Sequence, residues 1–131
     1  MRVPQIIMTL GLVVLVVLLL TPQRHPYRYN TAAEVTVHGV IQNVSNFYCP
    51  ISGGEGTHLT IATDKGTVQV HLAPARFLGG QQWKFSPGEE VEVVGSSVRF
   101  QGHEDLIARS IGRDGETMFV RTPEGKPVWA N

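Results

Sequence analysis

The chain has a single cysteine, Cys49, among its 131 residues. One cysteine excludes an internal disulfide framework and a zinc site built from several cysteines. Charge is also scarce: only 17% of the residues are charged, and eleven basic side chains balance eleven acidic ones. A neutral chain lacks the basic field with which nucleic-acid-binding proteins engage phosphates. The apolar share of 42% excludes a disordered chain, and the composition does not fit a coiled coil.

The longest apolar run stands at the amino terminus, where residues 6–20 carry no charge. Extended over residues 3–21, the run would form a helix of roughly 28 Å, close to the thickness of a bilayer's hydrocarbon core. A cleaved signal peptide is the alternative. It needs small residues soon after the apolar core, and residues 21–24 (TPQR) are not of that kind. We therefore predict an uncleaved transmembrane helix over residues 1–21.

Aromatic and basic side chains follow in residues 22–33, and such groups favour the headgroup zone of a membrane. We expect this linker to lie at the membrane surface. The residues expected at that interface are Arg24, Tyr27, Arg28 and Tyr29. A short charged head before an apolar run usually stays in the cytoplasm. The sequence thus favours a single-pass protein of the cell inner membrane whose domain, residues 34–131, lies on the periplasmic, exported side.

From residue 34 onward, apolar and polar residues alternate in short runs that turn-forming residues interrupt. A period of two is typical of β-strands. Residues 63–66 (TDKG) predict a tight hairpin between strands 58–62 and 67–72, and residues 74–78 fit a short helical turn. Further strands are expected at 35–41, at 90–94 continuing through 98–100, and at 106–111, with a final hairpin over 116–130.

The alternation slips by one residue at Gly95, which is typical of a β-bulge, and bulges help sheets to curl into barrels. Five strands with a helical link after the third predict an all-β, five-stranded Greek-key barrel. The C-terminal hairpin extends this barrel, and the transmembrane helix precedes it. An immunoglobulin-like sandwich is the alternative fold, but it needs about seven strands and usually lacks the helical link.

Two parts of the sequence resemble bacterial OB-fold domains. Residues 87–96 (PGEEVEVVGS) with residues 106–109 (LIAR) are similar to the closing half of such domains, and residues 35–41 (VTVHGVI) to their opening strand. The resemblance covers about residues 34–112 and implies an exported OB-fold-like barrel. It implies little about function, because this barrel hosts nucleic-acid binders, exported stress proteins and haem chaperones alike.

Three histidines are candidate metal ligands. If residues 64 and 65 form the hairpin loop, His58 and His71 lie opposite each other on the face turned away from the core, and His38 also points away from the core. Grouped imidazoles can bind zinc, copper or nickel, so a periplasmic haem or metal carrier is an alternative function. A polar sheet face uses histidine as it uses threonine, and we therefore expect these rings to be solvated, with no metal or cofactor bound.

Cys49 falls in residues 46–50 (NFYCP), which we place in the loop between the first two strands. We expect a small, partly buried apolar side chain there. An exposed thiol on the exported side would risk oxidation. That risk favours burial, either within the domain or against a partner.

The sequence offers little for catalysis or nucleic-acid binding. The outer face of strands 58–62 and 67–72 has no aromatic ring and no Lys or Arg, whereas single-stranded nucleic-acid-binding barrels use both there. That function is retained only as an alternative. No phosphate-binding loop or nucleophile elbow occurs, so we expect neither an enzyme nor a nucleic-acid partner. Arg109 fits an ion pair with Glu92 or a contact with a partner.

Aromatic residues outside the strand pattern are candidates for an interface, because tryptophan and tyrosine often anchor interfaces. We expect Phe100 and Phe119 in the core. The expected partner-binding residues are Phe47, Tyr48, Trp83 and Trp129. A tethered, non-catalytic barrel with such a surface predicts a binding or scaffold domain, an accessory subunit of an integral-membrane protein complex of the respiratory or photosynthetic type.

Overall fold

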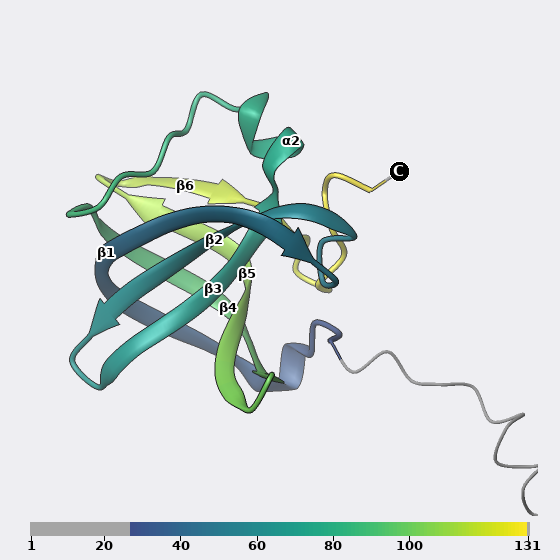
Figure 1. The fold of residues 1–131 in the computed structure, drawn as a ribbon, viewed down its shortest axis with the longest axis horizontal. Coiled ribbons are helices and arrows are strands. Elements are labelled where there is room, and N and C mark those ends of the chain that lie inside the picture. Colours follow the sequence, from purple (N-terminus) through teal and green to yellow (C-terminus); the bar gives the residue numbers. More distant parts are fainter. Residues whose placement is uncertain (1–26, 131) are drawn as a thin grey trace, which may run out of the picture.

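The computed structural model describes residues 27–130. Within this part of the chain, no helix is long and apolar enough to span a bilayer. The transmembrane helix predicted over residues 1–21 lies outside the described residues. The elements, labelled in Figure 1, are η1 (Thr31–Ala33), β1 (Glu34–Cys49), β2 (Gly54–Thr63), β3 (Gly66–Pro74), α2 (Ala75–Gly79), β4 (Glu90–Phe100), β5 (His103–Arg113) and β6 (Glu116–Phe119).

All six strands belong to one sheet, in the order β3-β2-β1-β4-β5-β6. Neighbours in this order run antiparallel, and β3 also pairs with β5 in parallel. Because β3 and β5 meet, the first five strands of that order bend round and close on themselves (Figure 1). The all-β class predicted from the sequence is thus confirmed, with the short helix α2 after β3 as expected.

The enclosed core consists of aliphatic side chains on alternate strand positions. Leu59 and Ile61 of β2 face Val70 and Leu72 of β3, and Val93 of β4 is equally buried. This is the alternation predicted for the 58–72 hairpin. The hairpin closes through the pair Thr63–Gly66, with a two-residue loop between them.

The strand pairings of the described residues contain three register shifts, and one of them lies between Thr57 and His58 in the pairing of β2 with β3. The pairing of β4 with β5 shifts between Val94 and Gly95, where the sequence predicts a bulge, but the extra residue, Arg109, belongs to β5 and not to β4. At Gly95 a Cβ atom would lie 2.5 Å from the carbonyl oxygen of Ile107, so this position has no room for a side chain. The third shift, between Ile41 and Asn43 of β1, had no clear sequence signal.

The structure corrects two expectations about aromatic and loop positions. β1 continues through Phe47 and Tyr48 to Cys49, so these residues end a strand rather than forming a loop. β1 can extend so far because its bulge lets it leave β4 and follow β2. Phe119, the last residue of β6, is 58% exposed and not in the core, because its chain neighbours Met118 and Val120 are buried instead.

Candidate metal centre

His58 on β2 and His71 on β3 are direct partners in the antiparallel pairing. This confirms the predicted register. The expectation that the rings are solvated is wrong, because the two residues are only 1% and 2% exposed. They lie on the opposite side of their strands from Leu59 and Val70, in a second buried region outside the main core.

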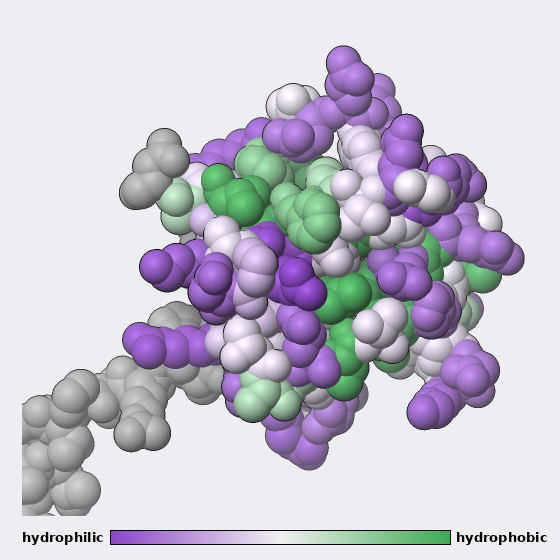
Figure 2. Space-filling view, turned by 180° about the vertical axis from the view of Figure 1, so that it is seen from behind, coloured by the Kyte–Doolittle hydropathy of each residue, from purple (hydrophilic) through white to green (hydrophobic). Residues whose placement is uncertain are grey.

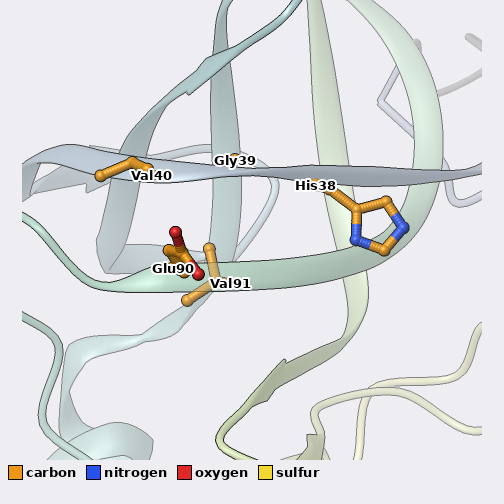
Figure 3. A pocket seen from close by; sticks show the side chains of 5 residues that line it. All are labelled: His38, Gly39, Val40, Glu90 and Val91. Atoms are coloured by element: carbon orange, nitrogen blue, oxygen red, sulfur yellow. The ribbon is translucent and has the colours of Figure 1, made fainter.

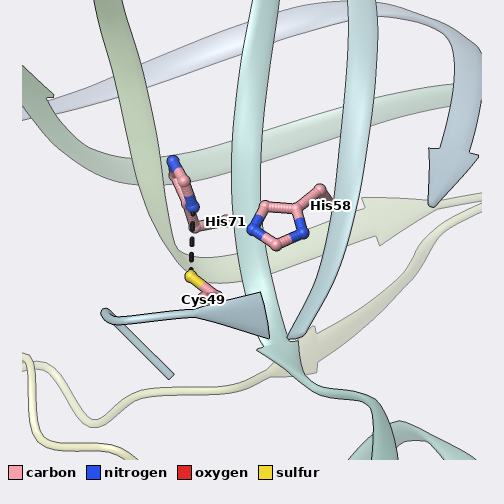
Figure 4. Close-up of side chains that lie close together, drawn as sticks. All are labelled: Cys49, His58 and His71. Atoms are coloured by element: carbon pink, nitrogen blue, oxygen red, sulfur yellow. Dashed lines mark hydrogen bonds between the residues drawn. The ribbon is translucent and has the colours of Figure 1, made fainter. Parts of the chain in front are cut away.

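The cover over the two histidines comes from β1 and β4. Cys49, the last residue of β1, places its Sγ 3.4 Å from Nδ1 of His71 (Figure 4). The ring of Phe47 stacks on His58 with centroids 3.7 Å apart, and Phe100 meets the His71 ring at 4.7 Å. Sequence reasoning missed this cluster because it assigned Cys49 to a loop instead of to the strand beside β2.

Cys49, His58 and His71 each offer one ligand atom, and these atoms lie within 4.8 Å of one another. Sulphur and nitrogen atoms that share one ion at about 2.0–2.3 Å are separated by roughly 3.3–3.9 Å. The 3.4 Å between Sγ and Nδ1 already falls in this range. A small shift of the His58 side chain would complete a three-coordinate site.

Asp105 of β5 fixes the orientation of His71. Its Oδ2 lies 2.8 Å from Nε2 of His71, and both groups are buried. A carboxylate only accepts hydrogen bonds, so Nε2 carries the proton and Nδ1 is turned toward Cys49. Carboxylates that hold a ligating histidine in this way are a regular feature of metal sites.

His58 has no hydrogen-bond partner at either ring nitrogen, although both nitrogens are buried. A buried polar group without a partner costs about 1–3 kcal/mol. Native structures rarely leave such groups unsatisfied. An ion between His58, Cys49 and His71 would satisfy one of these nitrogens.

The electrostatics of the cluster favour a thiolate ligand. Burial by itself raises the pKa of the Cys49 thiol. The interactions of the sulphur with the neighbouring side chains of His58 and His71 and with the Ser52 backbone stabilise the thiolate, and together they lower the pKa to about 5. Burial lowers the pKa of His71, and the neighbouring Cys49 and Asp105 outweigh it and raise that pKa. A metal ion would replace the proton shared between Sγ and Nδ1, since metals bind the deprotonated thiolate.

Cys49, His71 and Asp105 also form a hydrogen-bonded chain of the kind that activates a nucleophilic cysteine. A nucleophile must reach its substrate, but Cys49 is 1% exposed. A groove of about 890 Å³ beside the cluster is lined by Phe47, Phe100 and Asp105 but not by Cys49. The arrangement therefore suits a buried ligand set better than a nucleophile.

His38 does not join the other two histidines. Its ring is exposed on β1, with Nε2 3.5 Å from Glu92 of β4. The surface pocket beside it, of about 400 Å³, is lined by His38, Gly39, Val40, Glu90 and Val91 (Figure 3). Glu90 and Glu92 offer carboxylates here, but in the described residues only Cys49, His58 and His71 bring three ligand atoms close enough together to hold one ion.

The four residues predicted to bind a partner fall into two pairs. Phe47 is 42% exposed and Tyr48 is 74% exposed, so both remain available to a partner. Trp83 and Trp129 are partly buried against the core. Trp83 contacts Phe85, and Trp129 contacts Phe77. Figure 2 shows apolar residues exposed in patches among polar ones on one face of the domain.

Two of the predicted interfacial residues contact the barrel. The ring of Tyr27 lies 5.0 Å from that of Phe100. The Tyr29 hydroxyl donates a hydrogen bond of 2.5 Å to Glu34. Arg28 is exposed, and Arg24 lies outside the described residues. The chain thus enters the domain beside the β4–β5 hairpin (Figure 1).

Arg109 pairs with Glu34, at 2.6 Å, and not with Glu92. The Tyr29 hydroxyl and the Arg109 guanidinium lower the pKa of Glu34. Burial and the Glu34 carboxylate raise the pKa of Tyr29 to about 12. These three side chains fasten the start of β1 to β5.

Comparison with known proteins gives one family. The sequence model of the MamS/MamX magnetosome protein family matches residues 33–118. No protein with a curated description matches the chain. Among solved structures, the chain is similar to the crystal structure of the ZRD-deleted mutant of TiaS in complex with agmatine, with 18% identity and a TM-score of 0.49. That match covers 76% of this chain and 29% of the TiaS chain.

Proposed function

The chain belongs to the MamS/MamX magnetosome protein family. From this membership we propose that it is an accessory protein of the magnetosome, and from its buried cluster of Cys49, His58 and His71 we propose that it binds a metal ion. In this proposal the protein has no enzymatic activity of its own. Its β-barrel holds one transition-metal ion between the end of β1 and the β2–β3 hairpin. The ligands are Cys49, His58 and His71.

The observation that carries this proposal is the unsatisfied imidazole of His58. Its two nitrogens have no hydrogen-bond partner, and its ring is buried beside the Cys49 sulphur and Nδ1 of His71. Imidazole and thiolate are the donors that zinc and copper prefer. Asp105 supplies the supporting hydrogen bond that such a site needs.

Metal analysis of the full chain tests this proposal. The protein, purified in mild detergent, is incubated separately with Zn(II), Cu(II) and Ni(II), passed through a desalting column and analysed for bound metal. We expect about one ion per chain for at least one of these metals. Replacing Cys49 with serine or His71 with glutamine should reduce the bound metal at least tenfold.

His38→Ala is the matched control, because it removes an exposed histidine outside the cluster. It should leave the stoichiometry unchanged. Circular dichroism of each variant shows whether the barrel remains folded. If the folded wild-type chain retains none of the three metals, or if the His38 variant loses as much metal as the Cys49 variant, the proposal is wrong.

We also propose that residues 1–21 anchor the protein in the membrane and that the barrel associates there with an integral-membrane complex on the exported side. The apolar run of residues 6–20 supports the anchor, and the exposed rings of Phe47 and Tyr48 support the association. If residues 1–21 are an anchor, the protein should resist extraction from membranes by carbonate. If the barrel associates with a complex, membrane proteins should co-purify with the chain, and Tyr48→Ala should abolish this co-purification. A mature amino terminus between residues 21 and 34 would contradict the anchor.

The barrel itself is proposed to be an OB-fold. Three features support this assignment: β1 to β5 form a closed order, β3 pairs with β5 in parallel, and α2 lies between β3 and β4.

A nucleic-acid ligand remains disfavoured. The groove beside β2 and β3 is lined by no Lys or Arg in the described part of the chain, and it contains Glu104 and Asp105.

A further inference from the structure

We infer that the ion held by Cys49, His58 and His71 is copper. This inference rests on the proposed metal-binding function and names the metal of that site. It follows from the chemical type of the donors, their number and the aromatic rings that surround them.

The donors are one sulphur and two imidazole nitrogens. The carboxylate of Asp105 is hydrogen-bonded to Nε2 of His71. It therefore lies on the opposite side of the ring from Nδ1, the nitrogen that faces Cys49. Iron(III), manganese and magnesium favour sites rich in oxygen. The donor set therefore fits softer metals, copper and zinc above all.

The number of donors separates copper from zinc. Structural zinc sites have four protein ligands, and catalytic zinc sites keep an open position for water or substrate. In residues 27–130 the group contains three possible ligands and no fourth. All three ligand residues are buried, so an open, water-filled position is not available. Two histidines and one cysteine in a trigonal arrangement are the ligand set of copper electron-transfer sites.

The surrounding rings keep the site dry and bring it close to the surface. Phe47 stacks on His58, and Phe100 meets His71 edge to face. Both phenylalanines also line the groove of about 890 Å³. The ring of Phe47 therefore lies between the His58 ligand and the groove. A single electron can pass over a distance of one ring thickness while the ion stays buried.

The same ligands accept both oxidation states of copper. Cu(II) takes up one electron from an external one-electron donor and becomes Cu(I), and no bond to Cys49, His58 or His71 has to form or break. The proton on Nε2 of His71 stays on its hydrogen bond to Asp105. Asp105 is thus a positioning residue that keeps Nδ1 directed at the ion.

Visible absorption of the copper-loaded full chain tests the inference. The protein in mild detergent is titrated with Cu(II). We expect an intense visible band from charge transfer between the Cys49 thiolate and Cu(II), saturating at one ion per chain. Ascorbate, a one-electron donor, should bleach the band, and ferricyanide should restore it. Equimolar Zn(II) should not displace the copper.

Three variants test the thiolate ligand, the positioning residue and an exposed histidine outside the site. Cys49→Ser should remove the band, and Asp105→Asn should keep the band but weaken copper binding about 10- to 100-fold. His38→Ala should match the wild type. Circular dichroism verifies that each variant is folded. If Asp105→Asn fails to fold, Asp105→Glu, which keeps a carboxylate, should retain the band of the wild type.

The possible failures are distinguishable. If one Zn(II) per chain binds through Cys49 and displaces copper, or if bound Cu(II) gives no thiolate band, the site is a metal site but copper is the wrong metal. If Cu(II) instead oxidises Cys49 to an intermolecular disulfide, the copper inference is also overturned. If no metal binds, the proposed function itself fails.

Discussion

Cys49 combines a lowered pKa with almost complete burial, two properties with opposite effects on reactivity. Alkylating reagents attack thiolates, and they must also reach the sulphur. We expect iodoacetamide to modify Cys49 at least tenfold more slowly in the folded chain at pH 7 than in urea, as followed by mass spectrometry. Fast labelling of the folded chain would instead favour the chain Cys49–His71–Asp105 as a nucleophile.

Gly95 is a residue whose replacement the fold should tolerate poorly. Because its Cβ would lie 2.5 Å from the backbone of Ile107, Gly95→Ala should force β4 and β5 apart. We expect a loss of about 1–3 kcal/mol in the free energy of unfolding, measured by urea denaturation. Gly54→Ala is the control. It adds a Cβ that meets no atom within 4 Å, and it should change stability by less than about 0.5 kcal/mol.

Among elements, the C-terminal segment after β6 packs back onto the domain. Trp129 follows the last strand, yet its ring contacts Phe77 of α2 and lies 5.1 Å from the Arg121 guanidinium. Trp129→Ala should therefore destabilise the domain by about 2–4 kcal/mol. Tyr48→Ala, which removes an exposed ring at the end of β1, should change stability by less than about 0.5 kcal/mol. Thermal unfolding of both variants decides whether these two aromatics have the different roles assigned here.

The junction between the start of β1 and β5 should depend on pH. The folded state lowers the pKa of Glu34 below its ordinary value of 4.5. The ion pair with Arg109 therefore stabilises the fold above about pH 4.5 and loses this effect as the pH falls through the lower, folded pKa. Glu34→Gln should cost about 0.2–1 kcal/mol at pH 7. In unfolding experiments, the difference from the wild type should shrink at pH 3.

Strand elements were predictable where a local pattern determines them. The period of two placed Leu59 and Ile61 in the core, and the TDKG turn paired His58 with His71. The burial of those histidines was not predictable. The residues that cover them are Phe47 and Cys49 at the end of β1 and Phe100 of β4, and these meet the histidines only in the folded domain. The course of β1 depends on its bulge near Asn43 and on pairing with two different strands, which are properties of the tertiary structure.

For the whole molecule, metal binding and folding should be linked. An ion that binds only the folded chain stabilises it by about 2.7 kcal/mol when its free concentration is 100 times the dissociation constant. We expect copper to raise the melting temperature of the wild type by several degrees in differential scanning calorimetry. The Cys49→Ser variant should show no such rise. An equal rise in both proteins would indicate that copper binds elsewhere.

The position of the ligands along the chain has a consequence for the order in which the domain assembles. Cys49 and His71 are 22 residues apart, and His58 lies between them, so the three ligands belong to the first three strands. Contacts between residues close in sequence form faster than distant ones, because less chain entropy is lost. The ligands therefore meet as soon as β1, β2 and β3 pair. Asp105, 34 residues beyond His71, arrives only when β5 closes the barrel, and the hydrogen bond that fixes His71 is one of the last parts of the site to form.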